Sequence, residues 1–380
     1  MDSETFRIAG EQMDNHDLTR KESTMEREWE KYFREVDPYV PGEQPERPDA
    51  IKLNTNENPY PPSPKALEAL KGLDYTSFRR YPAPEADSLE EAIAENYGLK
   101  RENVFAGVGS DDVLALSFLT FFNSEKPVLF PEITYSFYSV WAKLLKVKYE
   151  TVPLVNFEIR PEDYRRENGG IVIANPNAPT GVLLPLEAVE DIVRNNQKSV
   201  VIVDEAYIDF GGTSALPLTR KYENLLIVQT FSKSRAFAGL RIGYAMGDRN
   251  LISAIKRVKN SFNSYPINTP AIVLGTAVAK DRAYYEGTIK KVTATRERVK
   301  KELKSLGFLF SDSMTNFIFA RREGTSAVDL MNALREKNIF VRHFGTPLLK
   351  DYLRITIGTD AEMDAFLAAT REYLKEHGEL

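Results

Sequence analysis

Two stretches in the middle of the chain end in residues that can carry acid–base and nucleophilic chemistry. One short apolar run ends in Asp204, and Tyr207 follows closely. The next apolar run ends in Thr230 and leads to Lys233, with Arg241 a little further on. If both runs are strands of one open sheet, their carboxyl ends mark the place where such sheets bind ligands. We therefore expect a carboxylate, a phenol, a lysine and an arginine at one edge of a sheet.

Each of these side chains has a use in the chemistry of pyridoxal phosphate (PLP). A carboxylate at the pyridine nitrogen keeps it protonated, which makes the ring an electron sink, and a phenol near the ring oxygen tunes it. A lysine forms an imine with the cofactor and, once released, moves a substrate proton. A phosphate needs a cation and hydroxyl groups, which Arg241, Ser232 and Thr230 supply. The pattern therefore predicts a PLP site.

A second part of such a site is suggested by Gly107–Asp112, which lies between a predicted strand and a predicted helix. Backbone N–H groups at the start of a helix bind anions, and glycine allows a ligand to come close. The same residues also fit an ordinary helix cap. Taken alone, Asp204 could likewise be a polar strand end and Lys233 a solvated loop lysine. Their order and spacing together favour the functional interpretation.

The elements that would position these residues alternate along the chain. Alternating strands and helices predict a mostly parallel sheet with helices on both faces. The strands are expected at 103–108, 127–130, 171–175, 200–204 and 225–230, and the helices at 110–122, 135–145 and 186–195. Further helical patterns cover 26–35, 65–70, 88–97, 252–257 and 284–306, and strands and helices mix over 308–320, 327–336, 339–344, 353–357 and 361–373.

The domain organisation follows from these patterns and from the length of 380 residues, which favours more than one hydrophobic core. Residues 1–24 are predicted to be a disordered arm. Residues 25–60 are expected to form an N-terminal segment, rich in proline and turn residues from 37 to 64. The family resemblance described below implies that this segment joins the small domain and a dimer partner. Residues 61–295 form a large PLP-binding domain, and residues 296–380 a smaller α+β domain.

Composition narrows the range of functions. The net charge of −5 does not favour nucleic acid as a partner. The chain has no Cys and only three His, so we expect neither disulfides nor a multi-histidine metal site. The apolar runs are too short to cross a bilayer, and the N-terminus lacks the apolar core of a signal peptide. A cytoplasmic protein with small-molecule substrates is expected.

Eight segments, in order, resemble the fold type I PLP-dependent aminotransferases, and most closely the histidinol-phosphate aminotransferases. The resemblance runs from about Pro38 to Tyr373 and implies an α/β fold, with a large domain built on a mostly parallel mixed sheet between helices. The segments are Asn54–Tyr60, Arg80–Pro82, Gly109–Asp112, Asn175–Gly181, Asp204–Tyr207, Thr230–Lys233, Ala238–Gly243 and Leu353–Gly358.

The resemblance implies a role for each matching position. Lys233 would carry PLP as a Schiff base, Asp204 would hold the pyridine nitrogen, and Tyr207 would hold the ring hydroxyl. Tyr135 would stack on the ring, and Tyr60 would reach the cofactor phosphate of a neighbouring subunit, which implies a homodimer. The cofactor phosphate would be held by Ser110, Asp111, Thr230, Ser232 and Arg241.

One position departs from the family pattern. Before Pro-Thr-Gly the family usually has an Asn that bonds the ring hydroxyl, whereas this chain has Ala178. Asn177 or Asn175 could take its place. A milder change is Asp112, where Glu is common.

The resemblance also implies a substrate pair. Arg354 would clamp the substrate carboxylate, and Tyr39, Tyr265 and Arg342 resemble positions that contact the substrate. Guanidinium groups suit both anions that the site must accept, the carboxylate of glutamate and the phosphate of the second substrate. The implied reaction is amino transfer between L-glutamate/2-oxoglutarate and imidazole-acetol phosphate/L-histidinol phosphate, in histidine biosynthesis. Packing is the alternative for the two tyrosines.

Other functions on related folds are the alternatives. A threonine-phosphate decarboxylase or an aromatic amino-acid aminotransferase would share the same PLP site, and only substrate assays separate them. A non-catalytic PLP-binding regulator would bring a DNA-binding domain, but the sequence has no helix-turn-helix pattern. A dehydrogenase would show Gly-x-Gly-x-x-Gly after a first strand, and it does not occur.

Overall fold

The structure, a computed structural model, describes residues 27–380, so the predicted disordered arm lies outside the described residues. The chain divides into two compact units between Asp37 and Pro38. Of the first unit, residues 27–37 are described, and they contain one short 3-10 helix, η1 (Glu30–Tyr32). The predicted helix over 26–35 is therefore wrong in length. None of the residues of η1 is buried, so no packing supports a longer helix.

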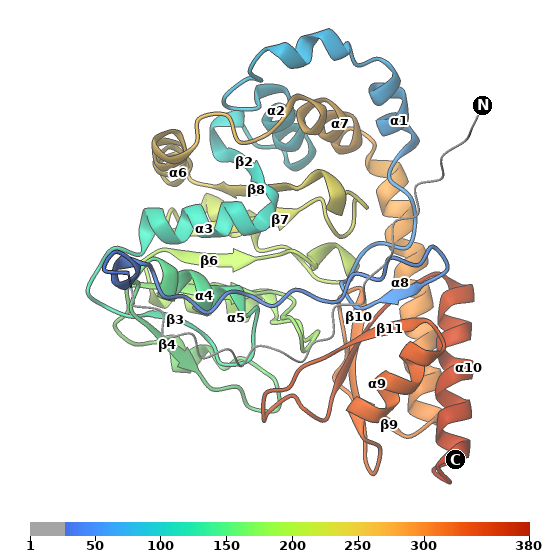
Figure 1. The fold of residues 1–380 in the computed structure, drawn as a ribbon. Helices are drawn as coiled ribbons and strands as arrows, with labels where there is room; N and C mark the ends of the chain where they lie inside the picture. Colours follow the sequence, from blue (N-terminus) through green and yellow to red (C-terminus); the bar gives the residue numbers. More distant parts are fainter. Residues whose placement is uncertain (1–26) are drawn as a thin grey trace, which may run out of the picture. The chain divides into compact units, whose positions relative to one another are not determined.

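The second unit, Pro38–Leu380, contains a seven-stranded sheet (Figure 1). Its order is β2 (Val104–Val108), β8 (Ile242–Gly247), β7 (Leu225–Thr230), β6 (Val201–Asp204), β5 (Gly170–Ala174), β3 (Val128–Pro131) and β4 (Tyr149–Val152). The neighbouring strands from β7 to β4 are parallel, whereas β8 is antiparallel to both β2 and β7. The predicted mostly parallel mixed sheet is confirmed.

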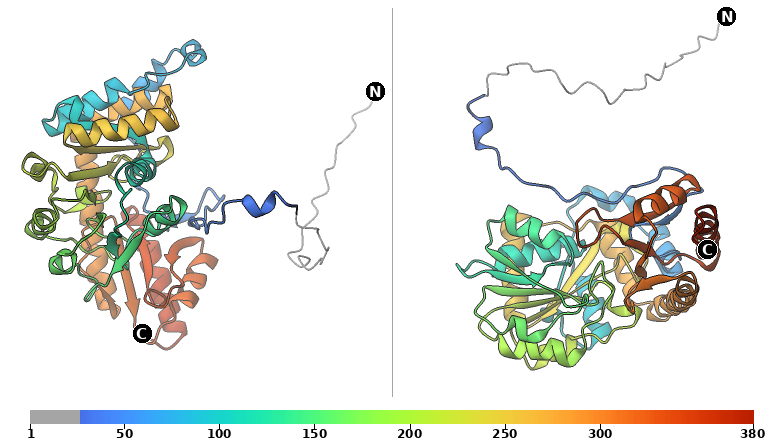
Figure 2. Two further views of the ribbon diagram at one scale, coloured as in Figure 1. Left: turned by 90° about the vertical axis from the view of Figure 1, so that its left-hand side faces the viewer. Right: turned by 90° about the horizontal axis from the view of Figure 1, so that it is seen from below.

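Helices lie on both sides of this sheet (Figure 2). Strand β6 illustrates the reason, because Val201 and Val203 belong to one core while Ile202 belongs to the other. Both faces of such a strand are buried, so it appears in the sequence as an unbroken apolar run. One core includes α2 (Asp87–Tyr97), α5 (Leu186–Asn195) and α7 (Thr269–Ala279), and the other includes α3 (Gly109–Phe121), α4 (Phe137–Leu144) and α6 (Arg249–Phe262).

A second sheet of five strands is built mainly from the C-terminal part of the chain. Its order is β1 (Ile51–Leu53), β11 (Ile339–His343), β12 (Leu353–Thr356), β10 (Phe317–Arg322) and β9 (Phe308–Phe310). A further core joins this sheet to α8 (Arg282–Ser305), α9 (Ala327–Glu336) and α10 (Asp360–Glu376). The predicted mixture of strands and helices after residue 308 is thus confirmed.

The structure adds elements that the sequence patterns did not predict. They are β1, β4, β8, α7 and the short turns of 3-10 helix η2 (Tyr75–Arg79), η3 (Arg101–Asn103), η4 (Pro161–Tyr164), η5 (Ile208–Phe210), η6 (Leu216–Arg220) and η7 (Ala238–Leu240). Helix α7 is apolar on almost all sides, so it lacks the periodicity that marks an amphipathic helix. Helix α1 (Pro64–Lys71) was expected.

The predicted boundary between a large and a small domain at residue 295 stays a prediction. Helix α8 passes this position without a break, and β1 comes from the predicted N-terminal segment. Within residues 27–380, no helix is both long and apolar enough to span a membrane.

Candidate active site

The topology brings the predicted chemical residues to one edge of the seven-stranded sheet. Strands β2 and β7 both run antiparallel to β8, so β2, β7, β6 and β5 all end at the same edge. Asp204 ends β6, Thr230 ends β7, and helix α3 starts directly after β2. Because β8 runs the other way, it begins at this edge, and Arg241 immediately precedes it.

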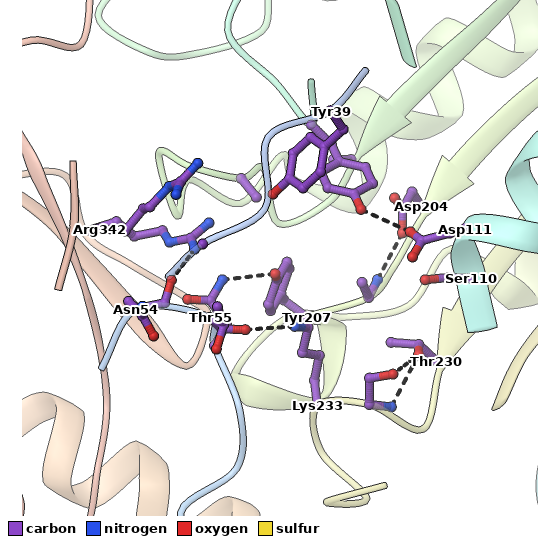
Figure 3. A pocket seen from close by; sticks show the side chains of 18 of the residues that line it. Tyr39, Asn54, Thr55, Ser110, Asp111, Asp204, Tyr207, Thr230, Lys233 and Arg342 are labelled. Atoms are coloured by element: carbon purple, nitrogen blue, oxygen red, sulfur yellow. Dashed lines mark hydrogen bonds between the residues drawn. The ribbon is translucent and has the colours of Figure 1, made fainter. Parts of the chain in front are cut away.

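A pocket opens at this edge (Figure 3). Twelve of the fifteen predicted site residues line it, namely Tyr39, Ser110, Asp111, Tyr135, Asp204, Tyr207, Thr230, Ser232, Lys233, Arg241, Arg342 and Arg354. The remaining lining residues are Gly42, Asn54, Thr55, Asn56, Ala174, Ala178 and Ala206. The walls therefore come from both sheets and from the segment between Pro38 and β1.

Asp204 is 5% exposed and holds its charge-bearing oxygens in two hydrogen bonds. The Tyr138 hydroxyl donates to Oδ2 at 2.8 Å, and the N–H of Ala206 donates to Oδ1 at 3.2 Å. Burial raises the pKa of Asp204 to about 6, against these two bonds and the charge of Lys233, which lower it. A carboxylate in such a place is well suited to pair with a cationic ring nitrogen.

Lys233 extends into the pocket from the loop after β7. Its Nζ donates to the carbonyl oxygen of Thr55 at 3.3 Å and lies 5.6 Å from the centroid of the Tyr207 ring (Figure 3). The Tyr207 hydroxyl accepts a hydrogen bond from Nδ2 of Asn56 at 2.9 Å. Asn56 has φ +57°, a left-handed conformation that non-glycine residues seldom adopt. Such strain persists where the surrounding contacts enforce it, and here Thr356 and Asn316 bond the same residue.

The start of α3 has the features of an anion site. The N-cap residue Val108 makes no side-chain hydrogen bond to this helix, and the carboxylate of Asp112 accepts from the N–H of Val108 at 2.9 Å. No side chain of residues 27–380 accepts from the N–H groups of Gly109, Ser110 or Asp111, which leaves them available to a ligand. Arg241 lies against the backbone there, because a Cβ on Gly109 would come within 2.6 Å of its guanidinium. The hydroxyls of Thr230 and Ser232 are 3.0 Å apart, and Nη1 of Arg241 is 3.4 Å from Ser232 Oγ.

The carboxylate of Asp111 has two partners within the chain. Its Oδ1 accepts from the Tyr135 hydroxyl at 2.8 Å, and its Oδ2 accepts from Arg241 at 3.0 Å. Burial raises the pKa of Tyr135, and the charge of Asp111 raises it further. Asp111 thus links Tyr135 to Arg241 at the start of α3. A negative group such as phosphate would approach the backbone N–H of Asp111 and not its carboxylate.

Two arginines of the five-stranded sheet form the opposite wall. Nη2 of Arg354 donates to the carbonyl oxygen of Asn54 at 2.8 Å, while its Nε has no partner among the described residues. Burial lowers the pKa of Arg354 from its ordinary value. Arg342 donates to the carbonyl oxygens of Pro41 and Val40, which fixes the segment that carries Tyr39. Tyr39 stacks on Phe137 with the ring centroids 4.3 Å apart.

Three predicted site residues do not line the pocket. Asn177 is buried, and its amide is bonded to Ile133, Thr134 and Thr180. Ala178 lines the pocket instead, so this wall offers a methyl group where the family pattern has an amide. Tyr265 is 44% exposed and stacks on Tyr81. Tyr60 packs against the core of the five-stranded sheet, with Nζ of Lys291 5.1 Å from its ring centroid.

Sequence reasoning missed three residues of the site. Tyr138 bonds Asp204, Asn56 bonds Tyr207, and the Thr55 carbonyl bonds Lys233. Tyr138 lies one helical turn from Tyr135, a spacing that could have drawn attention to it. Asn56 and Thr55 belong to the matching segment Asn54–Tyr60, but nothing in their types assigns them a partner.

The pocket fits an aromatic, anionic cofactor better than a metal ion. Over residues 27–380, no group of His, Cys, Asp and Glu is arranged to hold a metal. By contrast, β8 and α3 approach so closely that a Cβ on Gly243 would come within 2.2 Å of the Ser110 backbone nitrogen. This close approach, together with Arg241 and the free helix start, makes a cradle suited to a phosphate. The carboxylate of Asp204 lines the same pocket as this cradle.

Comparison with known proteins identifies the class. The family model for aminotransferase class I and II matches residues 48–369. The chain therefore belongs to the class I and II aminotransferase family, and it is a transaminase. Within this family, its curated relatives include the histidinol-phosphate aminotransferases of Pseudomonas putida and Lactococcus lactis subsp. cremoris. They are 51% and 49% identical over 91% of this chain, and the matches cover 99% and 98% of those proteins.

A solved structure supports the same assignment. Histidinol-phosphate aminotransferase from Sinorhizobium meliloti, in complex with pyridoxal-5'-phosphate, superposes with a TM-score of 0.79 at 25% identity. The match covers 86% of this chain and 91% of that one. The predicted resemblance and the fold class are both confirmed.

Proposed function

We propose that this enzyme uses PLP to transfer an amino group between L-glutamate/2-oxoglutarate and imidazole-acetol phosphate/L-histidinol phosphate. The observation that carries the proposal is that Lys233 and the buried carboxylate of Asp204 line one pocket that also has an anion cradle at its edge. The names of the relatives, at about half identity over nearly the whole chain, supply the substrate pair.

The cofactor would be held at three places. The start of α3, with Ser110, and the side chains of Arg241 and Ser232 would take the phosphate. Asp204 would pair with the ring nitrogen, and Tyr207 would bond the ring oxygen. Lys233 would form the covalent link. The remaining predicted contacts are stacking by Tyr135 and further phosphate contacts from Thr230 and Asp111.

When bound, PLP supplies an electron sink that stabilises the carbanion formed at the substrate α-carbon. The residues of the chain do the rest. The Lys233 amine would take the proton from the substrate α-carbon and deliver it to the cofactor carbon that bears the transferred nitrogen. Asp204, ionised above its pKa of about 6, would keep a proton on the ring nitrogen of the bound cofactor. Asn56 holds the Tyr207 hydroxyl in place by donating to it.

The two arginines of the five-stranded sheet account for the two substrates. Glutamate presents carboxylates, whereas histidinol phosphate presents a phosphate, and planar guanidinium groups bind both anions. Arg354 retains an unused donor, Nε, within residues 27–380. Tyr39 would cover the substrate from the segment that Arg342 fixes. Tyr265, stacked on Tyr81 outside the pocket, would contact substrate only across a subunit boundary.

The proposal includes a homodimer and a cytoplasmic location. Large apolar side chains are exposed around α1, η2 and the end of α6, namely Leu67, Leu70, Tyr75, Phe78, Tyr81, Phe262 and Tyr265. Exposed apolar groups of this size commonly mark protein–protein contacts. Tyr60 lies in the loop between β1 and α1, close in sequence to these exposed side chains, which agrees with its expected contact to a neighbouring subunit.

The test is a substrate panel on the purified, PLP-loaded protein. We expect 2-oxoglutarate to form from glutamate with imidazole-acetol phosphate as acceptor, and expect Lys233→Ala to reduce this rate by at least about 10³-fold. Lys198→Ala, which removes an exposed lysine from the opposite end of β6, should leave the rate unchanged. Release of carbon dioxide from threonine phosphate, or faster transfer to an aromatic keto acid, would overturn the substrate assignment.

A further inference from the structure

A chain of buried and half-buried polar side chains lies directly behind the pocket. We call it the polar layer, and it consists of Glu205, Gln229, Tyr97, Tyr244, Arg235 and Asp209. No member of the polar layer is among the described residues that line the pocket. Its members adjoin the pocket in sequence instead, because Glu205 follows Asp204, Gln229 precedes Thr230, and Arg235 lies two positions after Lys233.

Arg235 is the centre of the polar layer. Its side chain is 3% exposed, and its Nη1 donates to Asp209 Oδ2 and to Ser234 Oγ, both at 2.8 Å. Nη2 donates to the Tyr97 hydroxyl at 3.0 Å. Ser234 Oγ in turn donates to the same oxygen of Asp209 at 2.5 Å. The guanidinium therefore ties the residue next to Lys233 to an aspartate on η5.

From Arg235 the layer continues to the residue next to Asp204. The Tyr97 hydroxyl donates to Gln229 Oε1 at 2.7 Å, and Gln229 Nε2 donates to Glu205 Oε2 at 2.8 Å. Glu205 also accepts from the N–H of Ala215 at 2.7 Å. An unbroken hydrogen-bonded path thus links the loop that carries Lys233 to the strand end that carries Asp204.

Stability alone does not account for this arrangement. Arg235 is buried and Asp209 is half-buried, so this ion pair has a desolvation cost that offsets part or all of the attraction between the charges, and apolar side chains can often replace such a pair. A fork-shaped guanidinium, however, fixes the relative position of three partners at once. The backbone of the Lys233 loop is fixed from its other side as well, because Asn58 donates to the carbonyl oxygens of Lys233 and Ser234.

We propose that the Arg235–Asp209 pair positions the amine of Lys233 relative to the carboxylate of Asp204. The two charges of the pair also compensate each other, so that neither one shifts the protonation of the lysine nitrogen. This proposal rests on the proposed function, in which the amine of Lys233 and the carboxylate of Asp204 act on one cofactor. Arg235 and Asp209 are positioning residues, since the pocket walls separate them from the substrate.

Removing Arg235 and removing the charge of Asp209 should shift the protonation of the Lys233 nitrogen in opposite directions. Arg235→Met leaves the charge of Asp209 uncompensated, which favours the cationic, protonated state at the lysine nitrogen. Asp209→Asn leaves the charge of Arg235 uncompensated, which disfavours that state. The other groups facing Arg235 stay the same in both variants, namely Tyr97 on α2, Tyr244 on β8, Tyr285 on α8, and at the outer side Arg282, Glu286 and Lys290.

The experiment is a pH titration of the cofactor's absorption in the PLP-loaded enzyme, which reports protonation at the nitrogen that Lys233 contributes. We expect the midpoint to rise by at least about half a pH unit in Arg235→Met and to fall by a similar amount in Asp209→Asn. In both variants kcat should fall at least about tenfold, while KM for glutamate changes less than about threefold. Arg235→Lys should bring the midpoint back to the wild-type value.

The matched control is Arg322→Met, which removes another arginine–carboxylate pair. Arg322 bonds Glu379 and the carbonyl oxygen of Leu306, and neither partner adjoins a pocket residue. We expect this control to lower Tm without moving the midpoint. If Arg235→Met does not fold, Asp209→Asn decides the question together with Tyr97→Phe, which breaks the path without removing a charge and should lower kcat with an unchanged midpoint.

Two outcomes would overturn the inference. Midpoints that stay in place, with kcat within about twofold of wild type, would make the pair purely structural. Shifts in the same direction for both halves would exclude the charge balance. A wild-type enzyme that showed no absorption of a lysine–PLP imine at any pH would instead contradict the proposed function, so the two failures are distinguishable.

Discussion

At the scale of single residues, the site depends on how deeply a few polar groups are buried. Asp204 illustrates this, because burial raises its pKa and a phenol at Tyr138 holds its carboxylate. Asp204, Lys233 and Arg241 could be predicted from the sequence because they follow or flank apolar strands. Tyr39, Tyr135, Arg342 and Arg354 were predicted only through the family resemblance. Tyr138 and Asn56 could not be predicted, because their roles depend on neighbours that only the fold supplies.

Removing the charge of Asp204 tests this at the residue scale. Asp204→Asn keeps the size of the side chain and can still accept from Tyr138, so we expect Tm of the cofactor-free protein to change by only a few degrees. The variant cannot hold a proton on the ring nitrogen, and kcat should fall at least about 10²-fold. Steady-state kinetics of the PLP-loaded variant measure this. Activity within tenfold of wild type would contradict the role of Asp204.

At the scale of elements, the reversed strand β8 completes the site. Because β8 runs against β2 and β7, Arg241 and Gly243 lie beside the start of α3. Strands with long apolar runs could be predicted from the sequence, but β8 contains two glycines and was not recognised. Helix α7 was missed for the opposite reason, because it is too uniformly apolar to show a helical period.

The contact between β8 and α3 predicts the effect of adding one methyl group. In Gly243→Ala the new Cβ would lie 2.2 Å from backbone atoms of Gly109 and Ser110, which no side-chain movement relieves. We expect a loss of about 1–3 kcal/mol in the free energy of unfolding and a PLP affinity at least about tenfold weaker. Urea denaturation and fluorescence titration with PLP measure the two effects.

A nearby glycine provides the control for this prediction. A Cβ on Gly239 would have no heavy atom within 4 Å outside its immediate neighbours, although it also lies in the segment leading to β8. Gly239→Ala should therefore keep both properties of the wild type. Equal PLP affinity in the two variants would show that the close approach of β8 and α3 does not shape the cradle.

At the scale of the whole molecule, the pocket is shared between two sheets and, in our proposal, between two subunits. The fold class could be predicted because alternating strands and helices leave few alternatives. The contribution of β1 could not, since a three-residue strand in a proline-rich segment gives little signal. The subunit contact rests on Tyr60 and on exposed apolar side chains.

Mixed dimers test the sharing of sites between subunits. Tyr60→Phe and Lys233→Ala should each be poorly active alone. If Tyr60 serves the neighbouring pocket, mixing the two variants under conditions of subunit exchange gives hybrids in which one pocket has both wild-type residues. We then expect up to about a quarter of wild-type activity to return, by the statistics of a two-fold symmetric pair. Two differently tagged wild-type proteins, mixed under the same conditions and recovered together through one tag, serve as the control for exchange.

The outcome of the mixing experiment is decisive in either direction. No gain of activity over the separate variants, with exchange demonstrated by the control, would show that Tyr60 does not act across the subunit boundary.

Asp204 and Glu205 are adjacent buried carboxyl groups, and we expect them to make the stability of the protein depend on pH. Burial raises the pKa of Asp204 to about 6 and that of Glu205 to about 7. The folded state therefore keeps protons that the unfolded state has already lost. The stability that these two groups contribute is full below about pH 3.8 and decreases as the pH rises towards 7. For Glu205 the decrease is up to about 3 kcal/mol.

Urea denaturation of the cofactor-free protein at pH 5 and pH 8, at one fixed protein concentration, measures this decrease. Glu205→Gln should make it smaller, because the amide does not titrate. Glu187→Gln, a change in the first turn of α5, should leave the decrease as in wild type. A stability that rises between pH 5 and pH 8 would contradict the sign of the prediction.

The two-sheet construction of the pocket has a consequence for substrate choice. Arg241 belongs to the seven-stranded sheet, whereas Arg342 and Arg354 belong to the five-stranded sheet. The distance between Arg241 and the two arginines Arg342 and Arg354 is therefore set by how the two sheets pack against each other within the unit Pro38–Leu380. Rotating one sheet slightly against the other would select longer or shorter molecules without altering any side chain in the cavity. Residues of α8 belong to the core of the five-stranded sheet. Mutations that change substrate specificity should therefore also be found along α8, remote from the reacting atoms.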